Sequence, residues 1–262
     1  MDAFFVISGF GVGVLVGLTG VGGGALMTPL LIFGFGVAPA VAVGTDLMFA
    51  AITKANGVWV HARQSSVEWR IVGWMLMGSL PATLITLLVL RQVDIRTDAA
   101  QEAMTITLGI ALIASAGALI FRRRLAQSDT GLTHDETGRK TRIATVVTGV
   151  VLGALVTMTS VGAGALGAAA LFWLYPRMKA VRVVGTDLAH AVPLATVAGL
   201  GHWQLGTVDW VLLVSLLMGS LPGIYIGSRL SSRVPEIWLR SVLASLLLVI
   251  GLGAVFGGRL MA

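Results

Sequence analysis

The sequence predicts an all-helical polytopic membrane protein with two repeated halves, each made of a glycine-broken helical hairpin and three transmembrane helices. Three observations support this class. Hydrophobic residues fill 56% of the 262 positions and charged residues only 11%, which is far from the balance of a soluble domain. Apolar segments long enough to cross about 30 Å of hydrocarbon recur along the whole chain. Several short motifs also recur in the same order, as in a duplicated unit.

Eight apolar segments are predicted to enter the membrane. Two of them, residues 4–34 and 144–175, contain glycine clusters near their middles, and we expect each to form a hairpin of two short helices. The other six are continuous and have the length of a transmembrane helix. They are residues 38–60, 70–90, 99–121, 183–201, 210–228 and 236–257.

The duplication is visible as matching segments. LTGVGGGAL at 18–26 matches MTSVGAGAL at 158–166, and VGTDL occurs at 43–47 and again at 184–188. VEW, VDW and two copies of MGSLP continue the series in the same order. Between the halves lies a polar stretch without apolar periodicity, which is typical of a solvated linker. The predicted division is a first repeat at 1–121, a linker at 122–142 and a second repeat at 143–262.

The positive charge of the loops indicates how the two halves are oriented. If each glycine-broken segment dips in and returns on one side, one face of the membrane collects most Lys and Arg residues, and the other keeps only Arg91, Arg96 and Arg259. If each segment crosses once, the two faces carry nearly equal charge. Since cytoplasmic loops carry the Lys and Arg excess, we predict inverted repeats with both termini outside and the linker in the cytoplasm. Two short full crossings per hairpin give the same orientation and stay an alternative.

The two glycine clusters form the first candidate site. Non-helical backbone at membrane depth is tolerated only where it is buried or lines a cavity, and paired interruptions in two halves point to a transporter's binding site. The N–H groups at the start of the following helix favour an anion. Close helix packing is the alternative, and we adopt it for the spaced glycines before each cluster, which include Gly9, Gly13, Gly149 and Gly153. The predicted substrate-binding residues at the turns are Thr19, Gly20, Gly22, Gly23, Gly24, Thr159, Ser160, Gly162 and Gly164.

Ionisable residues inside membrane segments form the second candidate site. Asp46 and Asp187, in the two VGTDL motifs, are candidates for proton or cation coupling, with helix capping or an interfacial position as alternatives. Lys54 follows on the same helix face as Asp46; it can neutralise a substrate anion, or instead snorkel or pair with Asp46. Asn56 is a further substrate-binding candidate. His190 can relay protons in coupling or hydrogen-bond a neighbouring helix.

Other residue patterns exclude several function classes. The chain has no cysteine and no HExxH or GxSxG motif, so we predict no enzyme activity, catalytic residue, metal or cofactor. The net charge of +6 lies mainly in short loops, where membrane topology explains it, and no nucleic-acid partner is expected. His61 and His202 end matching helices beside tryptophans, and we predict that both lie at the membrane interface.

The order of motifs resembles that of the TauE/SafE family of sulfite exporters and related anion permeases. The resemblance rests on GLTGVGGGALMTPLLI, AVGTDL and HARQSSVEW, with the unit repeated, and covers nearly the whole chain outside the linker. It implies a multi-pass carrier of the cell inner membrane for sulfite, organosulfonates or other small organic anions. Family members often carry GTS where this chain has GTD, and the second glycine cluster has no counterpart of Pro29. Substrate, coupling ion and the equivalence of the two turns therefore stay open.

These inferences combine into one predicted function. We expect a secondary transporter that works by alternating access, binds a small anion between the two hairpins and is coupled to protons or cations. An uncoupled anion channel and a non-transporting membrane scaffold or receptor subunit are the alternatives. The expected partners are the anion and the lipid bilayer, and a homodimer is left open.

Overall fold

The computed structural model describes residues 3–19, 24–63, 65–95, 97–127, 138–230 and 236–256. Within these ranges the chain is helical and has no strand, so the predicted all-helical class is confirmed. The first half contains α1 (Ala3–Thr19), α2 (Gly24–Pro29), the π-helical turn η1 (Leu30–Gly34), α3 (Pro39–Arg63), α4 (Trp69–Gln92) and α5 (Asp98–Gln127). The second contains α6 (Arg139–Thr159), α7 (Ala165–Leu174), α8 (Ala180–Gln204), α9 (Trp210–Leu230) and α10 (Glu236–Phe256).

The apolar segments predict these helices closely. Each of the six continuous segments corresponds to one helix, namely α3, α4, α5, α8, α9 or α10. The glycine-broken segments contain α1, α2 and η1 in the first half, and α6 and α7 in the second. Within the described residues, five helices are long and apolar enough to cross a membrane: α4, α5, α6, α8 and α9. The protein is therefore a multi-pass membrane protein, as its hydropathy predicts.

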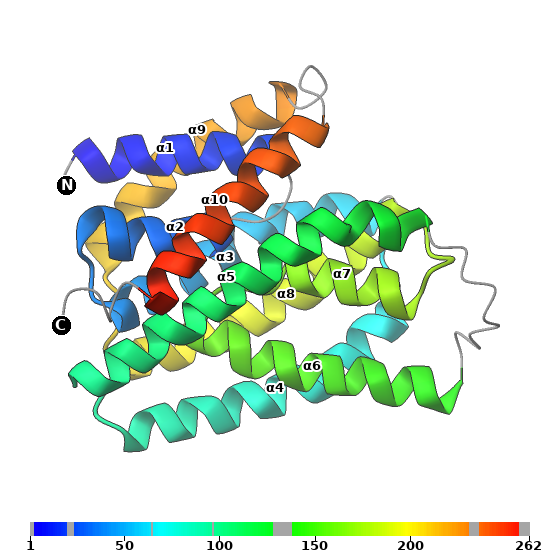
Figure 1. Ribbon diagram of the computed structural model, residues 1–262, viewed down its shortest axis with the longest axis horizontal. Helices are drawn as coiled ribbons and strands as arrows, with labels where there is room; N and C mark the ends of the chain where they lie inside the picture. Colours follow the sequence, from blue (N-terminus) through cyan, green and yellow to red (C-terminus); the bar gives the residue numbers. More distant parts are fainter. Residues whose placement is uncertain are drawn as a thin grey trace.

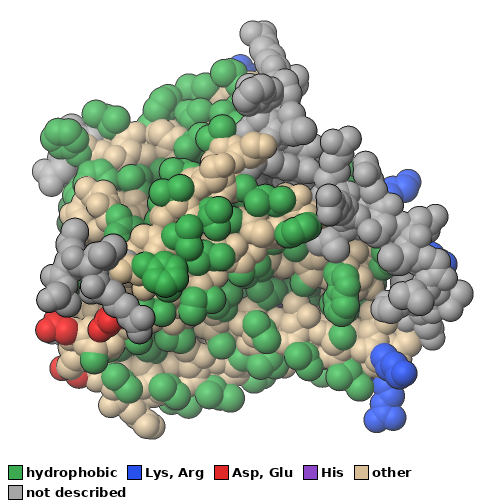
Figure 2. Space-filling view, viewed as in Figure 1, with side chains coloured by type: hydrophobic (Ala, Val, Ile, Leu, Met, Phe, Trp, Pro, Cys, Tyr) green, Lys and Arg blue, Asp and Glu red, His purple; other side chains and the backbone are tan. Residues whose placement is uncertain are grey.

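The molecule has two ends of opposite charge, between which most helices run (Figure 1). Lys and Arg side chains gather at the end where α6 starts and α7 leads into α8, whereas Asp and Glu side chains gather at the other (Figure 2). Hydrophobic side chains cover the surface between them, and many are more than half exposed, such as Leu84, Ile110 and Val249. A lipid bilayer is the environment in which such a surface is stable.

Helices from one half pack against helices from the other in matched pairs. The largest interfaces between helices of different halves are α1 with α9 and α4 with α6. A Cβ added to Gly9 would lie 2.5 Å from the carbonyl oxygen of Leu216, and one added to Gly13 would lie 2.5 Å from that of Ser220. Gly153 on α6 meets the carbonyl oxygen of Ser79 on α4 in the same way. The spaced glycines thus allow close backbone approach, and their predicted packing role is confirmed.

A second matched pair fixes α3 and α8, the two helices that carry the VGTDL motifs. The backbone N–H of Asp209 donates to the Thr45 hydroxyl at 3.0 Å, and the backbone N–H of Glu68 donates to the Thr186 hydroxyl at 3.0 Å. In both cases a threonine of one half holds the segment before a helix of the other half. The residues that follow these threonines, Asp46 and Asp187, are thereby held inside the bundle.

Candidate functional site

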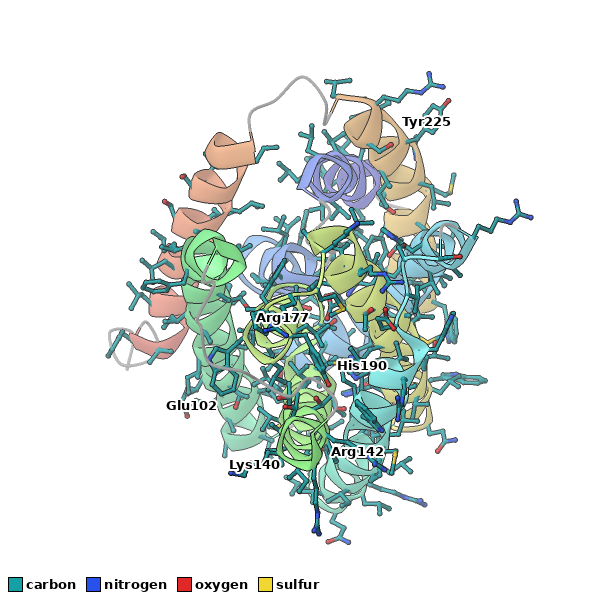
Figure 3. The ribbon with its side chains drawn as sticks, turned by 90° about the vertical axis from the view of Figure 1, so that its right-hand side faces the viewer. Glu102, Lys140, Arg142, Arg177, His190 and Tyr225 are labelled. Atoms are coloured by element: carbon teal, nitrogen blue, oxygen red, sulfur yellow. The ribbon has the colours of Figure 1, made fainter. Side chains whose placement is uncertain are left out.

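The ionisable residues of α3 and α8 meet in the interior. Asp46 and His190 are fully buried, Asp187 is 3% exposed and Lys54 is 8% exposed. Lys54 lies close enough to interact electrostatically with both carboxylates and with His190. In a view onto the end that carries Lys140, Arg142 and Arg177, His190 lies among the helices and not at their outer edge (Figure 3). We call Asp46, Lys54, Asp187 and His190 the central cluster.

The structure excludes one alternative interpretation of the carboxylates. Helix α3 begins at Pro39 and α8 begins at Ala180, so both aspartates lie well inside their helices and neither caps a helix. The capping interpretation of Asp46 and Asp187 is therefore wrong. Both carboxylates are also buried by protein, so neither is exposed to water on the surface of the molecule.

Lys54 links the first half to the hairpin of the second. Its ammonium group donates to the carbonyl oxygen of Ala163 at 3.1 Å, in the turn between α6 and α7. The side chain therefore points into the protein and does not snorkel. An ammonium group has three donors, so this bond leaves two of them for carboxylates or a ligand.

Asp46 is in contact with parts of both hairpins. Its Oδ2 atom accepts a hydrogen bond of 2.5 Å from the Thr28 hydroxyl on α2. The Ser160 side chain, at the end of α6, lies beside the same carboxylate, although its hydroxyl makes no hydrogen bond of standard geometry. The Oδ1 atom of Asp46 is buried without a hydrogen-bond partner among the described residues. A buried carboxylate oxygen in this state is expected to take up a proton or face a ligand.

Asp187 has different surroundings. Its Oδ1 atom packs directly against Gly167 on α7, at the position that a Cβ would occupy. His190 lies on α8, the helix that carries Asp187. Its Nε2 atom forms a hydrogen bond of 2.9 Å with the Ser79 hydroxyl of α4, while its Nδ1 atom has no partner among the described residues. One ring nitrogen of the histidine thus binds a neighbouring helix, and the other is left for a proton or a ligand.

The backbone conformation of the turn between α6 and α7 explains why glycines occur there. Gly162 and Gly164 have φ angles of 130° and 123°, and Ser160 has a φ of 57°. Such positive values favour glycine. The Thr159 hydroxyl donates to the carbonyl oxygen of Leu155 at 2.7 Å and accepts from the Val161 N–H at 3.1 Å, so it stabilises the turn.

Some backbone donors of this turn already have acceptors. The carbonyl oxygen of Gly162 accepts from the N–H groups of Leu166 and Gly167, at 3.1 and 3.0 Å. These two N–H groups belong to the first turn of α7, which was expected to face an anion. The polar side chains near the turn include the Ser160 hydroxyl and the Lys54 ammonium. Of the turn residues predicted for the second hairpin, Ser160 is therefore the side chain in the best position to meet a ligand.

Several predicted site residues fall outside the described part of the chain. Gly20, Gly22 and Gly23 lie between α1 and α2, where the structure describes nothing, and the side chains of Thr19 and Asn56 are not described either. Thr19 ends α1 and Gly24 begins α2. The sites predicted at these positions stay predictions.

The sequence analysis also missed several contacts. Thr28 and Gly167 were not singled out, although each follows its glycine cluster closely. Ser79 lies in the repeated MGSLP motif, which was noticed only as a repeat. The side chain of His202 is fully buried and hydrogen-bonds the Thr157 carbonyl oxygen and the Thr207 hydroxyl, both at 2.9 Å, and these contacts were not predicted.

Comparison with known proteins identifies the family. The model of the family described as sulfite exporter TauE/SafE matches residues 5–254. The chain belongs to the TauE/SafE family. This TauE/SafE protein is 41% identical over 256 residues to the probable membrane transporter protein YjnA of Bacillus subtilis (strain 168), which covers 96% of the chain and 99% of the relative.

More distant members extend the comparison. The probable membrane transporter protein YdhB of B. subtilis (strain 168) is 26% identical over 238 residues, covering 89% of the chain and 92% of the relative. A probable membrane transporter protein of Methanocaldococcus jannaschii is 27% identical over 265 residues, covering 94% of the chain and 92% of the relative. No solved structure matches the chain. This TauE/SafE protein is therefore a membrane transporter and not an enzyme.

Proposed function

We propose that this TauE/SafE protein is a proton-coupled secondary carrier of small anions, with sulfite and organosulfonates as the first candidates. The anion binds in the central cluster, against Lys54 and the turn between α6 and α7. Asp46, Asp187 and His190 carry the coupling proton. The name of the family supports the choice of sulfur-containing anions.

The observation that carries the proposal is a buried lysine placed between two buried carboxylates and a hairpin turn. Charge inside a membrane protein is costly and marks ion and substrate pathways. The Lys54 ammonium supplies the positive charge that an anion needs, and the Ser160 hydroxyl supplies a donor from the other half. A scaffold protein has no use for such an arrangement.

The charge balance of the central cluster explains the coupling. Two ionised carboxylates and one ammonium sum to one negative charge, so an anion entering this site would be repelled. If Asp46 or Asp187 takes up a proton, the repulsion falls and the anion can bind. Anion and proton then bind together, and each increases the affinity for the other. A coupling cation would act in the same way, but the Asp46 Oδ1 and His190 Nδ1 atoms, which have no hydrogen-bond partner among the described residues, favour a proton.

The arrangement of the hairpins supports alternating access between inverted repeats. In Figure 1, α1 and α2 form a hairpin open toward the end where the described chain begins, and α6 and α7 form one open toward the opposite end. We propose that repeats 1–121 and 143–262 have inverted topology in the inner membrane, with the termini outside and the basic end in the cytoplasm. Inverted repeats let two equivalent rearrangements expose one central site to either side.

The test is uptake of radiolabelled sulfite by proteoliposomes that contain the purified chain. We expect Lys54→Ala to reduce the initial rate at least about 30-fold, because it leaves buried carboxylates without their cation. Lys140→Ala, at the exposed start of α6, is the matched control and should transport normally. Unchanged sulfite uptake by Lys54→Ala would contradict the proposed site.

Two further measurements keep this test decisive. If Lys54→Ala fails to accumulate in membranes, the double variant Lys54→Ala/Asp187→Asn removes an opposite charge and should restore the folded protein without restoring transport. A thermal-shift screen with sulfite, thiosulfate, taurine, sulfoacetate and carboxylates identifies the anion class before transport is measured. A scaffold would show no stabilisation by any anion.

A further inference from the structure

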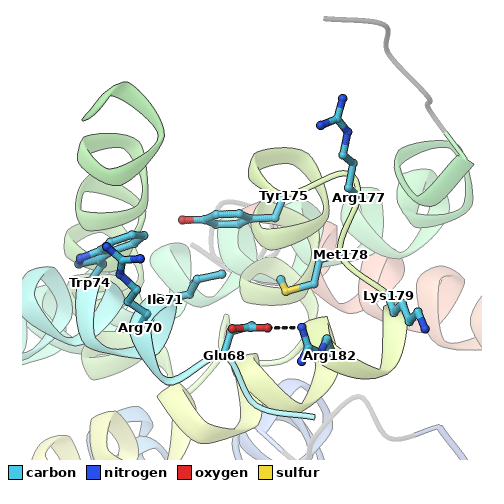
Figure 4. Close-up of a pocket in the computed structure, with 9 residues that line it drawn as sticks. All are labelled: Glu68, Arg70, Ile71, Trp74, Tyr175, Arg177, Met178, Lys179 and Arg182. Atoms are coloured by element: carbon cyan, nitrogen blue, oxygen red, sulfur yellow. Dashed lines mark ion pairs between the residues drawn. The ribbon is translucent and has the colours of Figure 1, made fainter. Parts of the chain in front are cut away.

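A second polar site lies at the basic end of the molecule, outside the central cluster. A pocket of about 530 Å³ opens where the first turns of α4 and α8 meet the loop after α7 (Figure 4). Trp74, Ile71, Tyr175 and Met178 contribute its apolar lining. The volume suits a small organic molecule.

The pocket carries a strong positive charge. Four cationic residues line it together with a single carboxylate, Glu68, which forms an ion pair with Arg182. Within the described part of the chain, Arg70, Arg177 and Lys179 have no carboxylate partner. The lining therefore has a net charge of about +3 and favours an anion.

The positions of two guanidinium groups are fixed by an aromatic ring. The guanidinium carbons of Arg70 and Arg142 each lie 5.4 Å from the centre of the Trp74 ring. Cation–π contacts of this kind restrain flexible arginines, and of these two Arg70 lines the pocket. The combination of guanidinium groups with apolar walls is suited to an organic anion that has a charged head and an apolar body.

The pocket adjoins the central cluster. The backbone N–H of Glu68 donates to the Thr186 hydroxyl at 3.0 Å, and Thr186 directly precedes Asp187. The Glu68–Arg182 ion pair joins the start of α4 to the start of α8 at this point (Figure 4). The ion pair therefore lies close to the segment of α8 that carries Asp187.

The other half of the chain lacks this pocket chemistry. At the 141-residue spacing of the VGTDL motifs, Asp209 corresponds to Glu68, but Val41 corresponds to Arg182 and Val211 to Arg70. The Asp209 carboxylate instead caps α9 by accepting from the N–H groups of Val211 and Leu212 at 2.9 and 3.0 Å. Glu68 makes no such cap bond. The packing of the repeat therefore does not require the Glu68–Arg182 pair.

We propose that the pocket is a docking site for organic anions bearing a sulfonate or carboxylate, and that the Glu68–Arg182 pair is its gate. The anionic head binds Arg182 and displaces Glu68 from it, and the positive charges of Arg177 and Lys179 at the rim attract the head to the pocket. The apolar body rests on Trp74 and Ile71. The role of the site as an entry vestibule rests on the proposed transport function, but binding to the pocket does not depend on the central cluster.

Binding of benzenesulfonate to the purified chain in detergent, measured by isothermal titration in low salt, tests the site. Replacing Arg177 and Lys179 together by Gln should weaken binding about tenfold or more. The double variant Arg139→Gln/Lys140→Gln, on α6 at the same end, is the matched control and should bind as the wild type does. Equal affinity for the pocket variant and the wild type would overturn the proposal.

The gate has its own test. Glu68→Gln removes the group that competes for Arg182, so benzenesulfonate should bind about three- to tenfold more tightly. A residue that only holds α4 and α8 together would not give tighter binding when replaced. Unchanged or weaker binding by Glu68→Gln would contradict the gate.

Two controls distinguish the docking site from the central cluster and from a lipid-binding site. Lys54→Ala should still bind benzenesulfonate in the pocket even when transport is lost, so failure of the central site and failure of the pocket are distinguishable. A phospholipid headgroup has the same anionic chemistry. If phosphatidylglycerol in nanodiscs abolishes benzenesulfonate binding to the wild type but leaves the binding of Arg177→Gln/Lys179→Gln unchanged, the pocket is a lipid site and the docking proposal is wrong.

Discussion

The two VGTDL motifs have identical sequences, but their aspartates have different surroundings. The difference indicates that Asp46 and Asp187 have different roles. Asp46 accepts a hydrogen bond from Thr28 and has Ser160 beside it. Asp187 packs against Gly167. At the spacing of the glycine clusters, the residue that corresponds to Thr28 is Ala168, which has no hydroxyl.

The charged and titratable neighbours differ in the same way. Lys54 follows the first motif, and its counterpart after the second is Ala195. His190 follows the second motif, and its counterpart after the first is Phe49. The two halves thus have similar backbones, but the lysine of the site comes from the first half and the histidine from the second. If the two halves had equal roles, we would expect the same side chains in both.

Among substitutions that alter the surroundings of the two aspartates, we expect Gly167→Ala to have the largest effect on stability and uptake. A Cβ at Gly167 would collide with the Asp187 carboxylate, and overpacking of a buried site costs about 1–3 kcal/mol. We expect a lower melting temperature of the purified protein and a loss of sulfite uptake, because Asp187 must move.

Gly117→Ala on α5 is the control for this substitution. A Cβ at Gly117 would meet no atom within 4 Å, and alanine favours a helix over glycine. Its melting temperature should be unchanged or higher. Equal stability and uptake of Gly167→Ala and Gly117→Ala would show that the contact between Gly167 and Asp187 has no importance.

A smaller effect is expected from Thr28→Val, which makes α2 resemble its hydroxyl-free counterpart α7 at this position. The substitution keeps the shape of the side chain but removes the 2.5 Å hydrogen bond to Asp46. Hydrogen bonds to charged groups contribute about 1.5–3 kcal/mol, so the half-saturating concentration of sulfite and its dependence on pH should change.

Thr148→Val on α6 is the matched control, because the Thr148 hydroxyl donates only within its own helix, to the Ala144 carbonyl oxygen at 2.8 Å. Its uptake should equal that of the wild type. If Thr28→Val and Thr148→Val give the same pH profile, the hydroxyl of Thr28 does not tune Asp46.

Local sequence predicted the fold well because membrane helices depend on properties that are local in the chain. The length of each apolar run and the position of each glycine cluster indicated the segments that became α3, α6 and α7. The spaced glycines indicated close helix contacts, and Gly13 makes one with the backbone of Ser220. In each case the physical cause, burial of apolar surface or absence of a Cβ, belongs to the residue itself.

The partners within the site were less predictable because they come from distant segments. The sequence left a substrate role, snorkelling and pairing with Asp46 open for Lys54, and the bond of Lys54 to the Ala163 carbonyl oxygen depends on how α3 crosses the second hairpin. The tryptophan after His202 indicated its depth in the membrane, but the hydrogen bond of His202 to the Thr157 carbonyl oxygen of another helix could not be read from the local sequence. Hydropathy gives the depth of a helix in the membrane but not the direction in which each of its side chains points.

Proton movement during anion transport tests the central claim most directly. Proteoliposomes containing the purified chain and a trapped pH-sensitive dye are given sulfite without a pH gradient. Our account predicts acidification of the lumen that begins with sulfite entry in the wild type, and loss of this coupled acidification in Asp187→Asn. Methanesulfonate, which is fully ionised and carries no proton of its own at neutral pH, serves as a second substrate so that entry of protonated sulfite alone cannot explain the signal. Anion entry without proton movement in the wild type, or the same ratio of protons to anions in Asp187→Asn, would contradict it.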